Sequence, residues 1–135
     1  MKILIDTNVL LDLLQNRQPF VEDALPIFEQ LDQGKLSGAI AAISITNIYY
    51  IVRKISGREI ANQAINQLLA TLHLIPVDRA IIEQAIALNF HDFEDAVQCA
   101  CAVAWQADVI VTRNPTDFQT SPIPVRSPKE ILNPD

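Results

Sequence analysis

Short apolar runs alternate along the chain with longer segments in which apolar residues recur every three or four positions. The short runs cover residues 3–5, 39–43, 73–77 and 108–112, and they are typical of buried strands. The longer segments, at about 7–14, 21–33, 44–55, 58–72, 78–88 and 92–106, predict helices. Strands that alternate with helices indicate βαβ units. We therefore predict a three-layer α/β/α fold with a central parallel sheet.

Polar residues mark where these helices are expected to begin. Thr7 or Asn8 can cap the first helix, and Ser44 can cap the helix that follows the second strand. Asp78 and Asp92 are placed in the same way before two later helices.

The C-terminal part of the chain is rich in proline. Five of the eight prolines lie beyond residue 114. Because proline cannot donate a hydrogen bond to a sheet, we expect residues 119–135 to form an edge strand or an extended tail. The length of 135 residues and the lack of a linker-like segment predict one domain, residues 1–135.

Composition narrows the possible functions. Half of the residues are hydrophobic and the net charge is −6, which argues against an extended surface for non-specific DNA binding. No apolar stretch approaches the roughly 18–20 residues of a membrane span. The two cysteines, Cys99 and Cys101, are badly spaced to bridge each other on a helix. We expect a soluble cytoplasmic protein with reduced, buried cysteines.

Several polar residues follow the predicted strands directly. In open parallel sheets, ligands bind at the carboxyl ends of the strands. Helices that run back from that edge also begin there, so four segments are expected to meet. The residues brought together are Asp6, Asn47, Asp95, Thr112, Asn114 and Asp117.

The window "HDFEDAVQCA" at 91–100 has two interpretations. Acids in a first helical turn are stabilised by the helix dipole, by roughly 0.3–1 kcal/mol each, and Asp92 and Glu94 fit such a capping or outer supporting role. Asp95 opens a helix that is almost entirely apolar. Beside Asp6 and Asp117 its charge would be repelled unless a cation intervened. Hard oxygen ligands of this kind suit Mg²⁺ or Mn²⁺.

Four motifs occur in order along the chain: "ILIDTNVLLDLL", "SITNIYYIVRK", "DFEDAVQCACA" and "VTRNPTDF". Together they resemble the PIN-domain ribonucleases, the fold of VapC-type toxins. The resemblance implies Mg²⁺ or Mn²⁺ binding at four positions, with Asp117 close by and with Asn8 and Thr112 supporting. Those positions are Asp6, Asn47, Asp95 and Asn114. The family usually has Glu where this chain has Asn47, so Asp92 or Glu94 would have to supply the missing charge.

The resemblance also implies a function. It predicts metal-assisted hydrolysis of RNA phosphodiesters, with Asp6, Asp95 and Asp117 as the catalytic acids. Candidate contacts to single-stranded or loop RNA are Arg113, Arg53 and Lys54. A homodimer and an antitoxin partner are implied as well. The apolar segments 20–33 and 58–72 are candidates for the dimer contact, and their burial within the monomer is equally consistent with the sequence.

Two other functions stay open. Asn47 is compatible with a catalytically degenerate PIN domain that serves as an RNA- or protein-binding scaffold. The second alternative is a phosphotransfer domain of receiver or haloacid-dehalogenase type, because Asp6 ends a first strand. However, a dehalogenase-type domain would have a second Asp where this chain has Asn8.

Overall fold

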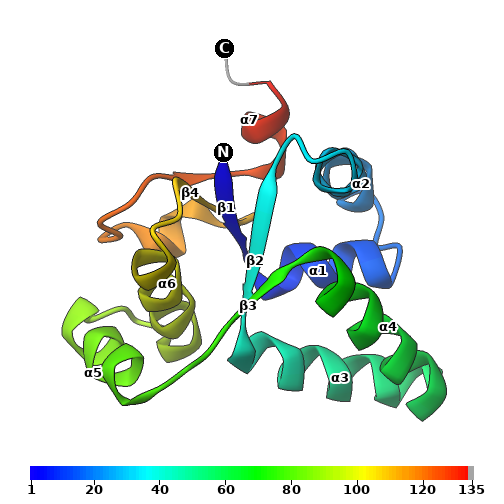
Figure 1. The fold of residues 1–135 in the computed structure, drawn as a ribbon, viewed down its shortest axis with the longest axis horizontal. Coiled ribbons are helices and arrows are strands. Elements are labelled where there is room, and N and C mark those ends of the chain that lie inside the picture. Colours follow the sequence, from blue (N-terminus) through cyan, green and yellow to red (C-terminus); the bar gives the residue numbers. More distant parts are fainter. Residues whose placement is uncertain (134–135) are drawn as a thin grey trace.

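The computed structural model describes residues 1–133 and contains one sheet of five parallel strands (Figure 1). The strands are β1 (Lys2–Ile5), β2 (Ser37–Ala41), β3 (His73–Ile75), β4 (Val109–Val111) and β5 (Val125–Arg126). Their order in the sheet is β3-β2-β1-β4-β5, so the first strand lies at the centre. Leu4 of β1 is in register with Ala39 of β2 and with Ile110 of β4. The predicted parallel sheet is confirmed.

Helices cover both faces of the sheet. They are α1 (Thr7–Leu14), α2 (Val21–Asp32), α3 (Ala42–Ser56), α4 (Arg58–Thr71), α5 (Arg79–Leu88), α6 (Phe93–Trp105) and α7 (Pro128–Leu132), with a 3-10 turn at Pro115–Phe118. Figure 1 shows α5 and α6 on one side of the sheet and α1 to α4 on the other. Ile3 and Ile5 pack toward α1–α4, whereas Leu4 packs toward α5 and α6. The three-layer α/β/α prediction is therefore confirmed.

Two of the predicted helix caps are wrong. Helix α1 already begins at Thr7, and the residue before it is Asp6, whose carboxylate caps nothing because other side chains bind it. Helix α3 begins at Ala42, since β2 ends at Ala41 in register with Ile75. Ser44 consequently lies inside the first turn of α3, fully buried, rather than before it.

The other two caps are confirmed. The Asp78 carboxylate accepts a hydrogen bond from the Ile81 amide at 3.0 Å, at the start of α5. Asp92 accepts one from the Asp95 amide at 3.1 Å, at the start of α6. These caps were predictable because both partners lie within three residues of each other.

The C-terminal segment is only partly as expected. Strand β5 is an edge strand, as predicted, but α7 follows it where a tail was predicted. Ser127 and Glu130 form a capping box around Pro128, the first residue of α7. That pattern stabilises a helix start and outweighs the proline content. The predicted tail extends to residues 134 and 135, which lie outside the described residues.

Two expectations from composition can be compared with the fold. Cys99 and Cys101 are free thiols and both are fully buried. Within residues 1–133, no helix combines the length and the apolar character that crossing a bilayer requires.

Candidate metal centre

A cleft of about 490 Å³ opens at the carboxyl ends of the central strands. It receives side chains from the starts of α1 and α6, from the middle of α3 and from the segment that follows β4. Five of its twelve lining residues are acids, three are asparagines, and none is Lys or Arg. The lining consists of Asp6, Thr7, Asn8, Leu11, Asn47, Tyr50, Ile51, Asp92, Glu94, Asp95, Asn114 and Asp117. The cleft is therefore a surface of oxygen donors with a large excess of negative charge.

Asp6 lies at the base of this cleft and is only 4% exposed. Gln98 Nε2 donates to its Oδ1 at 2.9 Å, and Thr112 Oγ1 donates to its Oδ2 at 3.0 Å. Burial raises the pKa of Asp6, and the hydrogen bonds from Gln98 and Thr112 act in the opposite direction. Both carboxylate oxygens are thus held in fixed positions, as a residue that orients a ligand requires.

Gln98 also connects Asp6 to the start of α1. Its Oε1 accepts the Thr7 amide at 3.1 Å, so one buried side chain fixes both the acid and the residue after it. Thr7 Oγ1 lies 2.7 Å from Ser44 Oγ and 3.3 Å from Glu94 Oε1. This network of hydrogen bonds joins α1, α3 and α6. It also includes Glu94, whose negative charge adds to the rise in the pKa of Asp6.

Asp95 lies in the first turn of α6, but the side chain that caps the helix is that of Asp92. The Asp95 amide is bound by the Asp92 cap, whereas the Asp95 carboxyl group faces the cleft. The pKa of Asp95 is raised to about 7. Burial is the largest cause, and the negative charges of Asp6, Asp92, Asp117 and Glu94 add to it. A carboxyl group in this condition is uncompensated, because its neighbours carry the same charge.

The remaining predicted residues come together as expected. Asn8, Asn47, Asn114 and Asp117 all line the same cleft. Asn114 is held by its backbone N–H, which donates a hydrogen bond to Thr112 Oγ1 at 3.2 Å. Thr112 is fully buried and lies behind Asp6 rather than in the cleft lining.

The donor set fits a hydrated divalent cation better than a closed cage. Within the described residues, no three His, Cys, Asp or Glu side chains are grouped closely enough to form a ready-made chelating site. Mg²⁺, however, keeps several of its waters and needs only one or two carboxylates. Five acids and three amide side chains around a cavity of this size supply those ligands and acceptors for the bound waters.

The three basic residues proposed for RNA are placed differently from one another. Arg53 and Lys54 are exposed in the last turn of α3, one to two turns beyond Asn47. Arg113 does not line the cleft but forms an ion pair with Asp12, at 2.7 Å between Nε and Oδ2.

Sequence reasoning missed four residues that shape the site. Gln98, Thr7 and Ser44 build the network under Asp6, and Asp12 is 1% exposed within α1. Two of them carried a signal, since a single polar residue in an apolar helix segment usually has a buried partner. Gln98 in "AVQCACAVAW" and Asp12 in "VLLDLL" are residues of this kind.

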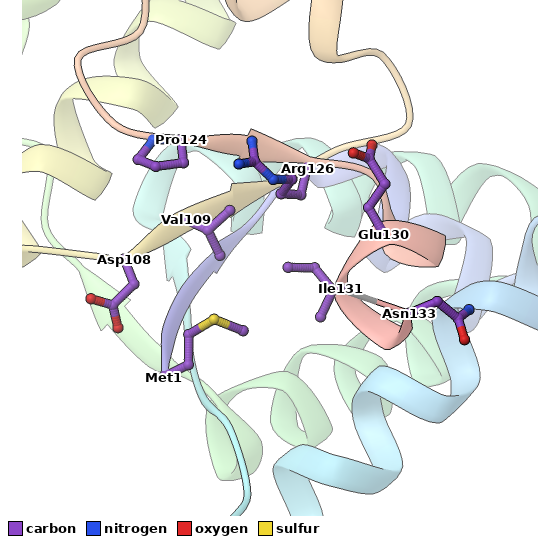
Figure 2. A pocket seen from close by; sticks show the side chains of 8 residues that line it. All are labelled: Met1, Asp108, Val109, Pro124, Arg126, Glu130, Ile131 and Asn133. Atoms are coloured by element: carbon purple, nitrogen blue, oxygen red, sulfur yellow. The ribbon is translucent and has the colours of Figure 1, made fainter. Parts of the chain in front are cut away.

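Two further cavities help to locate the site. One of about 510 Å³ lies at the amino ends of the strands, under α7, as Figure 2 shows. Its polar members do not converge on a common point: Asp108, for example, accepts the Lys2 amide at 2.7 Å. The other, of about 360 Å³, adjoins the acidic cleft and shares Asp92, Asp95 and Asp117 with it. We therefore place the site at the carboxyl ends of the strands, although the cavity there is slightly smaller.

The fold and the site together define an α/β domain with an acidic oxygen-donor cleft at the carboxyl edge of a parallel sheet. The family model of the PIN domain matches residues 2–116, and the chain therefore belongs to the PIN-domain family. A search of curated proteins gave no match.

Solved structures with the same fold include components of toxin–antitoxin systems. A toxin–antitoxin complex from Klebsiella pneumoniae is 27% identical, with 93% of this chain and 97% of that chain covered and a TM-score of 0.69. VapBC-1 from nontypeable Haemophilus influenzae is 15% identical, with 96% and 99% covered and a TM-score of 0.72. VapC20 of Mycobacterium tuberculosis, a sarcin-ricin loop cleaving toxin, is 16% identical, with 80% and 86% covered and a TM-score of 0.64.

Proposed function

We propose that this protein is a Mg²⁺- or Mn²⁺-dependent endoribonuclease, and that it is the toxin of a VapBC-type toxin–antitoxin pair. The observation that carries the proposal is the convergence of Asp6, Asp95 and Asp117 on one cleft, with Asn114 beside them. Membership of the PIN-domain family supports the nuclease class. The similar structures named above support the toxin assignment.

Four residues would hold the metal in this proposal: Asp6, Asp95, Asn114 and Asp117. A bound divalent ion supplies Lewis acidity, which activates water and stabilises the charge of the leaving oxygen. Asp6 provides a fixed oxygen, since Gln98 and Thr112 hold it from behind. Before a metal binds, burial and the neighbouring acids raise the pKa of Asp95 to about 7, and a bound cation would stabilise its ionised form.

Asn8 and Asn47 have a separate role. Their amide groups can donate to phosphate oxygens, which carboxylates cannot do. They lie on α1 and α3, on the part of the cleft lining that has no carboxylate of its own.

The substrate that the surface suits best is single-stranded or loop RNA. The acidic cleft continues past Asp92, Asp95 and Asp117 into the neighbouring 360 Å³ cavity, so a flexible strand can cross the acids. Arg53 and Lys54 are exposed in the last turn of α3, the helix that carries Asn47 of the cleft lining, and are the proposed phosphate contacts. Few basic residues are available for tracking a rigid duplex.

We further propose a homodimer and an antitoxin as protein partners in the cytoplasm. Leu25 of α2 and Leu69 of α4 are 47% and 46% exposed, and a groove of about 370 Å³ lies between these two helices. A second copy would cover that apolar surface. Sedimentation as a monomer at micromolar concentration would remove the dimer from the proposal.

A second candidate function is an RNA- or protein-binding scaffold without catalysis. Asn47 favours it, because an amide on this side of the cleft carries no negative charge for a metal ion. The scaffold predicts weak Mg²⁺ binding and no cleavage. Glu94 argues for activity, because it supplies an acid to the same cleft from α6.

The first experiment is cleavage of a mixed single-stranded RNA pool with Mg²⁺ or Mn²⁺ against EDTA, comparing the wild type with Asp95→Asn. We expect cleavage that requires the metal and is lost in the variant. Equal cleavage by both proteins would identify a contaminating nuclease. Absence of cleavage by a folded wild type, together with no measurable Mn²⁺ binding, would favour the scaffold.

A further inference from the structure

An ion pair lies directly behind the candidate metal centre. Asp12 is 1% exposed, and the Arg113 guanidinium contacts both of its oxygens, with Nε to Oδ2 at 2.7 Å and Nη2 to Oδ1 at 3.3 Å. Arg17 is a more distant cation, 3.9 Å from Asp12. The Arg113 guanidinium carbon also lies 3.9 Å from the centre of the Phe20 ring, which is close enough for a cation–π interaction.

This pair joins two segments that both contribute to the cleft. Arg113 lies between Thr112, which binds Asp6, and Asn114, which lines the cleft. Asp12 lies one helical turn after Asn8, another lining residue. A displacement of Arg113 would therefore move Thr112 and Asn114 relative to α1.

The same contacts argue against an RNA-binding role for Arg113. Its side chain is only 24% exposed, and two of its three nitrogens are used by Asp12. Phe20 covers one face of the guanidinium. An arginine that contacts phosphate needs its planar group free to approach the backbone.

We infer that Arg113 is a positioning residue. Through its forked contact with Asp12 it holds the segment 112–114, and with it Thr112 and Asn114, in the geometry that the metal centre requires. This inference rests on the proposed function for its catalytic consequence, but the positioning itself is a property of the fold. It replaces the phosphate-binding role predicted for Arg113 from the sequence.

Arg113→Lys separates the possible roles. Lysine keeps the positive charge that a phosphate contact needs, but it cannot reproduce the planar two-point contact with Asp12. We expect the folded variant to keep its KM for RNA and the salt dependence of RNA binding. We expect kcat to fall roughly 10- to 100-fold, as for a misplaced catalytic group, and Mn²⁺ affinity to fall as well.

The double variant Asp12→Asn/Arg113→Gln is the control for folding. It removes both charges, so no uncompensated charge is buried. We expect it to regain thermal stability relative to Arg113→Gln while kcat remains low. Full recovery of kcat together with stability would show that the pair serves stability alone, and the inference would be wrong.

Two other results would overturn the inference. One is the signature of a phosphate contact. In that case Arg113→Gln would have a raised KM, and the slope of log affinity against log salt concentration would be smaller by about one, while Arg113→Lys would stay close to the wild type. The other is unchanged amide exchange at residues 112–117 in Arg113→Lys. The exchange measurement needs neither RNA nor metal, so it tests the positioning role even if the wild type neither cleaves nor binds Mn²⁺.

Discussion

The two ends of the sheet carry cavities of nearly the same size, but their charged groups are arranged differently. The amino-end cavity measures about 510 Å³ and the carboxyl-end cleft about 490 Å³. At the amino end, polar groups are paired locally: Asp108 accepts the Lys2 amide, and Glu130 closes the capping box of α7. At the carboxyl end, five acids line one cleft without a lysine or arginine among the lining residues.

This difference indicates that charge left without a partner, rather than cavity volume, marks the end of the sheet at which we propose the site. A fold gains nothing by gathering like charges, because each added carboxylate raises the free energy of the others. Asp95 is an example: burial and the neighbouring acids raise its pKa to about 7, which means that its ionised form is destabilised. Sites that store such strain are typically those where a ligand relieves it.

The largest expected effect is the difference between removing one charge at the carboxyl end of the sheet and removing one at the amino end. Asp6→Asn should lower metal-dependent RNA cleavage by on the order of 10²–10³-fold, because several kcal/mol of charge stabilisation depend on that oxygen. Asp108→Asn is the matched control and should leave cleavage within about twofold, since its Asn can still accept the Lys2 amide. Initial rates at saturating Mg²⁺ measure both. Similar losses in both variants would remove the distinction between the two ends.

The next effect is a pH dependence of stability in the metal-free protein. The folded-state pKa of Asp95 is raised from 3.8 to about 7, so its contribution favours folding at low pH and is lost as the pH rises toward 7. Allowing for solvent, we expect a loss of about 1–2 kcal/mol. Relative to the wild type, Asp95→Asn should gain melting temperature at pH 8 but not at pH 4, and Mg²⁺ should narrow the gap. A gap of equal size at pH 4 and pH 8 would contradict this prediction.

A smaller gain is expected from restoring an acid on α3. Asn47→Glu should tighten Mn²⁺ binding about tenfold, because ligand charge sets the affinity of such sites. Calorimetric titration measures it, and Asn62→Glu, an exposed position on α4, is the control for added charge alone. Equal tightening in both variants would mean that Asn47 does not face the ion. Tighter binding without any gain in cleavage would favour the scaffold.

The smallest expected effect lies at the amino end. Ile131 lines the cavity of Figure 2 and packs partly against the core, so Ile131→Ala should cost about 1 kcal/mol of stability. Thermal melting should detect a shift of a few degrees, whereas the RNA cleavage rate should not change. A loss of cleavage larger than the loss of folded protein would show that this end also takes part in function.

Features decided by local sequence were predictable. The caps at Asp78 and Asp92 involve partners three residues away, and the sheet follows from short apolar runs between helices. The capping box of α7 is local too, with Ser127 and Glu130 around a proline, but the prediction for this segment rested on proline content alone.

Features decided by distant contacts were not predictable. Ser44 has the composition of a cap, but its hydroxyl meets Thr7 of another helix. Arg113 was predicted to contact RNA, because its partner Asp12 is 101 residues earlier in the chain and the ion pair is not visible in the local sequence. Strand ends and topology predicted which acids gather in the cleft. They did not predict Gln98, whose orientation depends on packing between α6 and α1.

The central position of β1 has a consequence for synthesis of the protein. β1 pairs with β4, and Asp6, the acid at the end of β1, can join Asp95 and Asp117 only after all residues through 117 have been made. Since contacts between such distant residues form late in folding, an incomplete chain on the ribosome has no assembled cleft. For the proposed ribonuclease, this order means that the cleft cannot act on RNA before the segment up to Asp117 has been translated.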